Sequence, residues 1–216
     1  MKLTQELNKS QTIKLILLFI SVALFLLIVE NVYDKEIMVA DIAGYNFIST
    51  HIISDFATPI AKVVTNLGGA GVLILITIIL AIVLKNKKIS LSIAINLIII
   101  TLLNLLLKHI VQRPRPTEFR MISESGYSFP SGHSMVSMAF YGYFIYLIHK
   151  NIENKILKWI LISTLSIVIL AIGTSRIYLG VHYTSDVLAG FIISFSYLII
   201  YTSIVKRLMI TEKWKE

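Results

Sequence analysis

The chain has 216 residues, of which 56% are hydrophobic and only 15% are charged, and its net charge is +8. Soluble domains carry about 45–50% apolar and about 25% charged residues, so this composition excludes a disordered chain or a nucleic-acid-binding tail and argues against a soluble enzyme. The chain has no cysteine, which excludes disulfides and cysteine metal sites. We therefore expect a polytopic membrane protein, for which lipid is the main solvent.

Six long apolar runs follow one another along the chain, each close to the length of about 20 residues that a helix needs to cross a bilayer. They lie at residues 13–32, 67–84, 89–107, 133–148, 159–174 and 185–205. The basic head before the first run is also typical of a signal peptide, but no small-x-small cleavage site follows, and Glu30 and Asp34 close the run. The sequence thus predicts an all-α bundle of six transmembrane helices in a single domain, residues 1–216, with the first helix as an uncleaved anchor.

The segment between the first two spans, residues 33–66, is mixed in character. Apolar side chains recur there every three or four residues, which is helical spacing, whereas charged residues interrupt them and Pro59 breaks any long helix. We expect short amphipathic helices on the outer membrane surface rather than a plain connecting loop. The apolar positions are Val39, Ile42, Tyr45, Ile48, Ile52, Phe56, Ile60 and Val63.

The basic residues are distributed unevenly between the two sides of the predicted bundle. Thirteen of the 20 Lys and Arg residues fall in the head, in the links at 85–88 and 149–158, and in the tail. With six spans these four segments lie on one side, which the positive-inside rule makes cytoplasmic. We expect a multi-pass protein of the cell membrane with both termini in the cytoplasm. The opposite, extracytoplasmic side then carries residues 108–132 and 176–182.

Polar residues that are costly at membrane depth gather at the outer ends of the last four spans. An up–down topology brings these ends to one face of one bundle. The residues are Lys108 and Arg115 after the third span, Ser131, Gly132 and His133 at the start of the fourth, Arg176 at the end of the fifth, and His182 and Asp186 at the start of the sixth. One of them alone would be an interfacial anchor or a helix start, but so much converging positive charge predicts an anion site.

Each part of this set suits phosphate chemistry. The Arg side chains offer a planar fork that binds phosphate with two hydrogen bonds, and Lys adds a mobile point charge. Ser131 and Gly132 stand where a helix begins, so backbone N–H groups can hold oxyanions there. Because His182 and Asp186 are four residues apart, the carboxylate can bind one ring nitrogen and leave the other free to attack. His133 can then donate a proton to the leaving oxygen.

These residues as a set resemble the three-part signature of the type 2 phosphatidic acid phosphatase superfamily: K-x6-R-P, P-S-G-H and S-R-x5-H-x3-D. All eleven fixed positions are present in order between residues 108 and 186. The resemblance implies a metal-independent membrane phosphatase without a cofactor, in which His182 forms a phosphohistidine, Asp186 orients it and His133 is the general acid. It implies that the phosphoryl oxygens are held by Lys108, Arg115, Ser131, Gly132 and Arg176.

A site at the membrane surface favours lipid phosphates as substrates, since a lipid can reach it sideways from the bilayer. The compact chain resembles the bacterial phosphatidylglycerophosphatase B type, and its candidate substrates are undecaprenyl diphosphate, phosphatidylglycerophosphate and phosphatidic acid. The motifs recognise the phosphate rather than the tail, so the choice stays open. A lipid phosphotransferase and a non-catalytic phospholipid-binding protein are the alternatives, and neither nucleic acid nor an obligate protein partner is expected.

Arg113 stands close to the first motif but outside its fixed positions. It could contact a diphosphate or a lipid head group. We interpret it instead as a loop cation near anionic lipid, which is an ordinary place for a basic residue beside a membrane.

Overall fold

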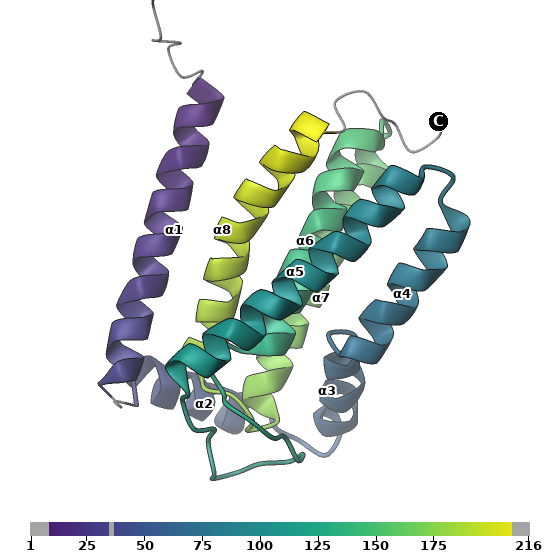
Figure 1. Ribbon diagram of the computed structural model, residues 1–216. Coiled ribbons are helices and arrows are strands. Elements are labelled where there is room, and N and C mark those ends of the chain that lie inside the picture. Colours follow the sequence, from purple (N-terminus) through teal and green to yellow (C-terminus); the bar gives the residue numbers. More distant parts are fainter. Residues whose placement is uncertain (1–8, 35–36, 209–216) are drawn as a thin grey trace, which may run out of the picture.

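The structure is a computed structural model that describes residues 9–34 and 37–208. Four of the basic residues used to predict the orientation lie outside the described residues: Lys2, Lys35, Lys213 and Lys215. The described part contains eight helices and no strand, so the predicted all-α class is confirmed (Figure 1). The helices are α1 (Lys9–Tyr33), α2 (Val39–His51), α3 (Ala57–Asn66), α4 (Ala70–Val83), α5 (Lys87–Val111), α6 (Gly132–Asn151), α7 (Lys155–Tyr178) and α8 (Thr184–Leu208).

Each of the six predicted apolar runs lies mainly in one of the long helices. Over the described residues, α1, α5, α7 and α8 are long and apolar enough to cross a membrane, and the pair α3 and α4 would add a fifth span if counted as one. That pair is bent by 49° where the chain passes through Gly68 and Gly69. The second predicted run, residues 67–84, accordingly becomes helical only from Ala70.

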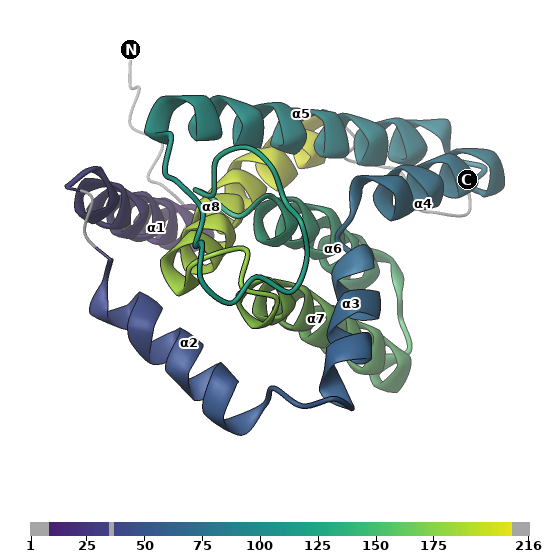
Figure 2. The same cartoon turned by 90° about the horizontal axis from the view of Figure 1, so that it is seen from below.

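Helix α6 is the least apolar of the long helices because it is surrounded by protein. It packs against α5, α7 and α8 at the centre of the bundle (Figure 2). It turns polar side chains such as Ser134 and Ser137 inward as well as Phe140 and Tyr143. With 20 residues at about 1.5 Å each, it is about 30 Å long, which is the thickness of a bilayer core.

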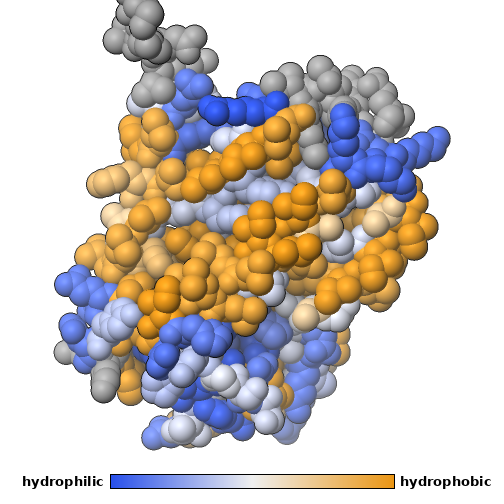
Figure 3. Space-filling model, in the orientation of Figure 1, coloured by the Kyte–Doolittle hydropathy of each residue, from blue (hydrophilic) through white to orange (hydrophobic). Residues whose placement is uncertain are grey.

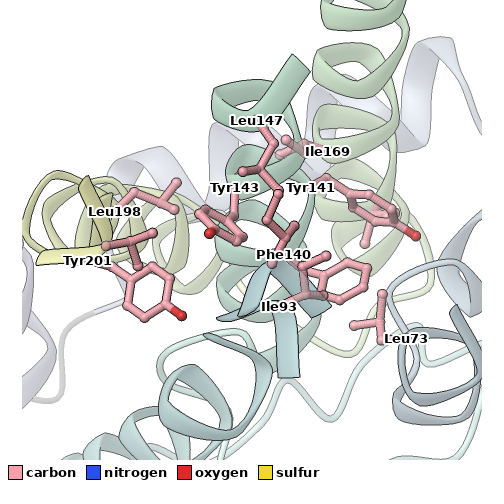
Figure 4. Packing of buried hydrophobic residues seen from close by; sticks show 12 residues of the cluster. Leu73, Ile93, Phe140, Tyr141, Tyr143, Leu147, Ile169, Leu198 and Tyr201 are labelled. Atoms are coloured by element: carbon pink, nitrogen blue, oxygen red, sulfur yellow. The ribbon is translucent and has the colours of Figure 1, made fainter. Parts of the chain in front are cut away.

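The middle of the bundle combines apolar packing with hydrogen bonds between helices. Figure 4 shows Ile93 of α5, Phe140 and Tyr143 of α6 and Tyr201 of α8 in one buried cluster. The Tyr143 hydroxyl lies 2.7 Å from that of Ser92. Polar contacts of this kind join helices in a lipid environment, where the apolar tails of the lipids compete with apolar packing.

The surface has an apolar belt between two polar ends, as expected of a multi-pass membrane protein. In Figure 3 hydrophobic side chains cover the middle of the bundle and hydrophilic ones cover its top and bottom. The helix ends that carry Lys9, Lys87, Lys155 and Lys206 lie together at one end (Figure 1). We call the other end, where α5 and α7 end and α6 and α8 begin, the site end.

The segment between the first two long helices forms α2 and α3 rather than a plain loop, as predicted. These two helices lie across the site end and pack on α7, and α2 also packs on α8 (Figure 2). The inner face of α2 carries a charged residue. Asp41 is buried, whereas Val39 and Ile42 of the predicted apolar stripe are exposed. The reason is that the inner face of α2 meets charged groups of the site end rather than an apolar core.

Candidate active site

The predicted site residues lie on four segments that meet at the site end. They are the last turn of α5, the long connection at residues 112–131, the first turn of α6, and the turn that joins α7 to α8. Gly180 makes this last turn possible, because its φ of 66° is a left-handed conformation that other residues rarely adopt. A Cβ atom there would lie 2.4 Å from the carbonyl oxygen of Phe119, so glycine also lets the long connection approach.

His182 and Asp186 form a direct pair at the start of α8. The ring Nδ1 of His182 lies 3.3 Å from Oδ2 of Asp186. The same oxygen accepts the backbone N–H of Tyr183 at 3.0 Å. Helix α8 begins at Thr184, so His182 precedes the helix, and the carboxylate reaches back over the first turn to meet it. The predicted contact across four residues therefore exists.

The other ring nitrogen of His182 faces a cation. Its Nε2 lies 3.0 Å from Nη1 of Arg115, which is always a donor. Both contacts are satisfied when Nδ1 carries the proton and Nε2 keeps its lone pair. Burial lowers the pKa of His182 to about 4, which keeps the ring neutral at neutral pH. Asp186 thus holds one ring nitrogen, and the lone pair of the other faces the Arg115 guanidinium.

Asp186 binds Arg113 through its second oxygen. Nη1 of Arg113 donates to Oδ1 of Asp186 at 2.6 Å and to the hydroxyl of Ser185 at 2.8 Å, and Nη2 donates to Oδ2 of Asp41 at 2.8 Å. The guanidinium also lies 4.0 Å from the centre of the Tyr183 ring. Our interpretation of Arg113 as a loop cation near lipid is therefore wrong. The two carboxylates draw the side chain inward, where it is 6% exposed.

Arg176 and Arg115 meet a carboxylate, Glu124, that the sequence analysis missed. Nη2 of Arg176 donates to Oε1 of Glu124, and Nη2 of Arg115 lies 3.8 Å from Oε2. Nη1 of Arg176 donates to the hydroxyl of Thr65 at 2.7 Å. Burial alone would raise the pKa of Glu124, but the hydrogen bond and charge of Arg176 and the charge of Arg115 outweigh it and hold this pKa below its usual value. An acidic residue between two Arg-containing motifs was the available signal.

Lys108 and the start of α6 form the side of the site next to α5. The ammonium group of Lys108 donates to the carbonyl oxygens of Tyr127 and Ser128. Ser131 caps α6 by accepting the N–H of Ser134 at 3.4 Å. A Cβ at Gly132 would lie 3.0 Å from Oδ1 of Asn104, so a side chain at this position would crowd the wall that α5 provides.

The backbone at the start of α6 is tied to α8. The N–H of Ser131 donates to the carbonyl oxygen of Asp186 at 3.0 Å. This N–H is therefore not available to bind an anion, in contrast to the prediction. The next N–H groups, of Gly132 and His133, have no partner within the helix because they belong to its first turn. They remain the candidate oxyanion donors.

His133 lies in the first turn of α6, next to the two arginines and Glu124. Arg176, Arg115, Glu124 and His182 are the charged or ionisable groups around its ring. A Cβ at Gly68 would lie 3.3 Å from the His133 ring, so the bend between α3 and α4 packs against it. The structure thus brings all eight predicted site residues to the site end.

A cavity of about 840 Å³ opens beside His182. It lies between α2, residues 116–121 of the long connection, and the turn that joins α7 to α8. Its lining includes Asp41, Tyr45, Arg120, His182, Tyr183 and Thr184. Within the described ranges, no group of three or more His, Asp or Glu side chains is arranged to hold a metal ion. Of the eight predicted site residues, His182 alone lines this cavity.

Comparisons with known proteins agree with this geometry. The family model of the PAP2 superfamily matches residues 87–210. Phosphatidylglycerophosphatase B of Bacillus subtilis (strain 168) is 38% identical over 94 residues, a match that covers 42% of this chain and 45% of the relative. The matched segment thus spans less than half of that relative's length.

Two solved structures share the fold. The crystal structure of a transmembrane PAP2-type phosphatidylglycerolphosphate phosphatase from Bacillus subtilis superposes with a TM-score of 0.80 over 90% of this chain and 98% of that one, at 24% identity. LpxE of Aquifex aeolicus superposes with a TM-score of 0.62 over 80% of this chain and 98% of that one, at 22% identity. At these identities the likeness shows the arrangement of the helices and nothing further.

Proposed function

The chain belongs to the PAP2 superfamily, and on this premise we propose that it is an integral membrane lipid phosphatase that works through a phosphohistidine. The observation that carries the proposal is the geometry of His182. One ring nitrogen lies against the Asp186 carboxylate at 3.3 Å, and the other is directed toward Arg115 at 3.0 Å. A buried neutral imidazole held in this way is suited to attack phosphorus.

In the first step Nε2 of His182 attacks the phosphorus atom of the substrate. A P–N bond forms, and the bond from phosphorus to the leaving oxygen breaks. His133 gives a proton to that oxygen, which departs as an alcohol or as a lipid monophosphate. The positive charge that develops on the His182 ring is stabilised by Asp186 across Nδ1–H.

In the second step water attacks the phosphorus of the phosphohistidine. His133, now without its proton, accepts a proton from this water. The P–N bond breaks, its electron pair returns to Nε2, and inorganic phosphate leaves. The two steps restore His182 as a neutral ring and return a proton to His133.

The phosphoryl oxygens need positive charge and hydrogen-bond donors while the bonds to phosphorus change. We assign this role to Lys108, Arg115 and Arg176 together with the hydroxyl of Ser131 and the backbone N–H of Gly132. In this scheme the side chains supply the charge that a metal ion supplies in other phosphatases. We therefore expect turnover to be metal-independent and to need no cofactor.

Lipid phosphates are the proposed substrates because the cavity beside His182 is bordered by α2, whose exposed side chains are largely apolar. The name of the Bacillus subtilis relative makes phosphatidylglycerophosphate the first substrate to test. Undecaprenyl diphosphate and phosphatidic acid present the same phosphate chemistry to the site and complete the panel.

We further propose that α4 and α6 also cross the membrane, which gives six spans in one domain over residues 1–216. Helix α6 is central and about as long as a bilayer core, and α4 continues the bent pair. The basic helix ends opposite the site end support a cytoplasmic location for both termini. The site end then faces the extracytoplasmic side.

The test is phosphate release by the purified protein in mixed micelles, with the three lipids as substrates and EDTA in every reaction. We expect turnover of at least one lipid, and we expect His182→Ala to lower it by more than about 10³-fold. His149→Ala, at an exposed histidine of α6 near the opposite end, is the matched control and should keep full activity.

The intermediate can be sought directly as phosphate that is covalently bound to protein and labile in acid. Labelling that disappears in His182→Ala would support the assignment of the nucleophile. Normal phosphate release by that variant would refute it. Folded protein that releases no phosphate from any of the lipids would refute hydrolysis, and a screen of acceptor lipids would then test a phosphotransferase.

A further inference from the structure

Arg113 joins two buried carboxylates that come from distant parts of the chain. It lies 2.6 Å from Oδ1 of Asp186 in α8 and 2.8 Å from Oδ2 of Asp41 in α2. Both carboxylate side chains are 0% exposed, and that of Arg113 is 6% exposed. Movement of any one of these three buried side chains would leave a buried charge without its partner, which is costly. We therefore expect their relative positions to be rigid.

The donors of Arg113 are directed at protein oxygens rather than at the place where phosphate would bind. Nη1 serves Asp186 and Ser185, and Nη2 serves Asp41. One face of the guanidinium is covered by the Tyr183 ring at 4.0 Å. Arg113 therefore differs from Arg115, which lies 3.0 Å from the reactive nitrogen of His182.

Asp41 holds the first turn of α8 by a second contact. Its Oδ1 accepts the N–H of Ser185 at 2.7 Å. Its Oδ2, besides binding Arg113, accepts the N–H of Met38 at 3.2 Å. Asp41 thus binds both the residue next to Asp186 and the arginine that holds the Asp186 carboxylate.

We propose that Asp41 and Arg113 are positioning residues that hold the Asp186 carboxylate in the orientation in which it meets His182. The assignment rests on the proposed phosphatase function. Arg113 occupies Oδ1, which leaves Oδ2 for Nδ1 of His182 and for the N–H of Tyr183. A carboxylate bound at only one oxygen could rotate, and the imidazole would turn with it.

One of the two proposed positioning residues, Asp41, lies outside the segment that the family model matches, and the other, Arg113, lies inside it. That segment covers residues 87–210, whereas Asp41 belongs to α2, which lies across the site end. Gly44, on the same helix, lets α2 approach α8 so closely that a Cβ would lie 2.2 Å from the Thr184 hydroxyl. The docking of α2 and the geometry of the catalytic pair are therefore linked.

The test compares Asp41→Asn and Arg113→Lys with the wild-type protein in mixed micelles. Asn keeps the size of the side chain and can still accept the N–H of Ser185, and Lys keeps the charge but cannot bridge two carboxylates. We measure kcat, KM and the inhibition constant of inorganic phosphate, and we check by gel filtration that each variant is monodisperse.

We expect kcat to fall about tenfold to a hundredfold in both variants, since small misplacements of reacting groups cost rates of this order. KM and phosphate inhibition should stay within about twofold of wild type, because neither residue touches phosphate in this assignment. Asp55→Asn, in the exposed segment between α2 and α3, and Arg207→Lys, at the far end of α8, are the matched controls and should change nothing.

A kcat within twofold of wild type for both variants would overturn the assignment. A rise in KM and a loss of phosphate inhibition at unchanged kcat would place the two residues in phosphate binding and would overturn it as well. If neither variant is recovered in monodisperse form, the pair serves the stability of the fold rather than positioning. Wild-type protein without any turnover would instead refute the proposed function, so the two failures are distinct.

Discussion

Charged side chains at the site end are arranged so that each buried charge meets an opposite one. Asp186 forms an ion pair with Arg113, and Arg176 forms one with Glu124. Breaking a fully buried pair by removing one partner costs about 3–5 kcal/mol, so the loss of either partner of the buried Asp186–Arg113 pair would destabilise the fold. The Glu124 side chain is 28% exposed, so its pair is screened and contributes less. An incoming phosphate would meet guanidinium groups whose positions are already set by protein carboxylates.

The pH dependence of turnover follows from the burial of His182. Because burial lowers its pKa to about 4, the ring stays neutral until the pH falls close to that value. We expect the acid limb of kcat/KM to lie near pH 4, well below the ordinary histidine value of 6.5. The measurement is kcat/KM from about pH 3 to pH 8, corrected for the titration of the substrate phosphate by ³¹P NMR. A corrected midpoint at the ordinary histidine value would contradict the prediction.

Helix α2 and the turn that joins α7 to α8 decide the shape of the site although they carry few of its reactive groups. Gly180 lets the chain reverse within a few residues between α7 and α8, which brings His182 to Asp186 and Arg115. Helix α2 closes the site end from outside and contributes Asp41 and one wall of the cavity. Its exposed apolar side chains, such as Val39 and Phe47, suit a helix at a membrane surface.

Replacing Gly44 by alanine tests the contact between α2 and α8. A Cβ at this position would lie 2.2 Å from the Thr184 hydroxyl oxygen and 3.1 Å from its Cβ, so the Thr184 side chain or α2 itself must shift. We expect a loss of about 1–3 kcal/mol, seen as a thermal midpoint lowered by several degrees in detergent, together with reduced turnover. Gly71→Ala in α4 is the matched control, because nothing lies within 4 Å of its added Cβ. Equal behaviour of the two variants would contradict the predicted crowding.

The whole molecule is divided by charge and hydropathy into three zones. On the face shown in Figure 3 an apolar belt covers the middle of the helices between two hydrophilic ends. The helix ends that carry Lys9, Lys87, Lys155 and Lys206 form one end, and the paired charges of the site occupy the other. Loops rich in Lys and Arg stay in the cytoplasm when a membrane protein is inserted. The proposed orientation follows from this asymmetry and not from the site itself.

Single cysteines can test this orientation, because the chain contains no cysteine of its own. We expect a membrane-impermeant maleimide to label Glu118→Cys on intact cells, since residue 118 lies in the long connection at the site end. Lys87→Cys, at the start of α5, should be labelled only after the cells are permeabilised. Labelling of residue 87 on intact cells would overturn the topology, and retained turnover of both variants serves as the control for folding.

The sequence alone was sufficient for the helical class, for the six apolar runs, and for the gathering of the motif residues at one end. These features depend on hydrophobic runs of a set length and on residues at fixed spacing, which can be read along the chain. The roles of His182, Asp186 and the cations were predictions from resemblance, and they stay proposals.

Only the tertiary structure decided the partners of the charged residues outside the motifs. Arg113 was expected near lipid but binds Asp41 and Asp186, and Glu124 was not singled out but pairs with Arg176. These pairs join residues that are far apart along the chain, so no local spacing reveals them. The physical reason is that a buried charge requires an opposite charge, and which one it meets depends on how helices from different parts of the chain pack.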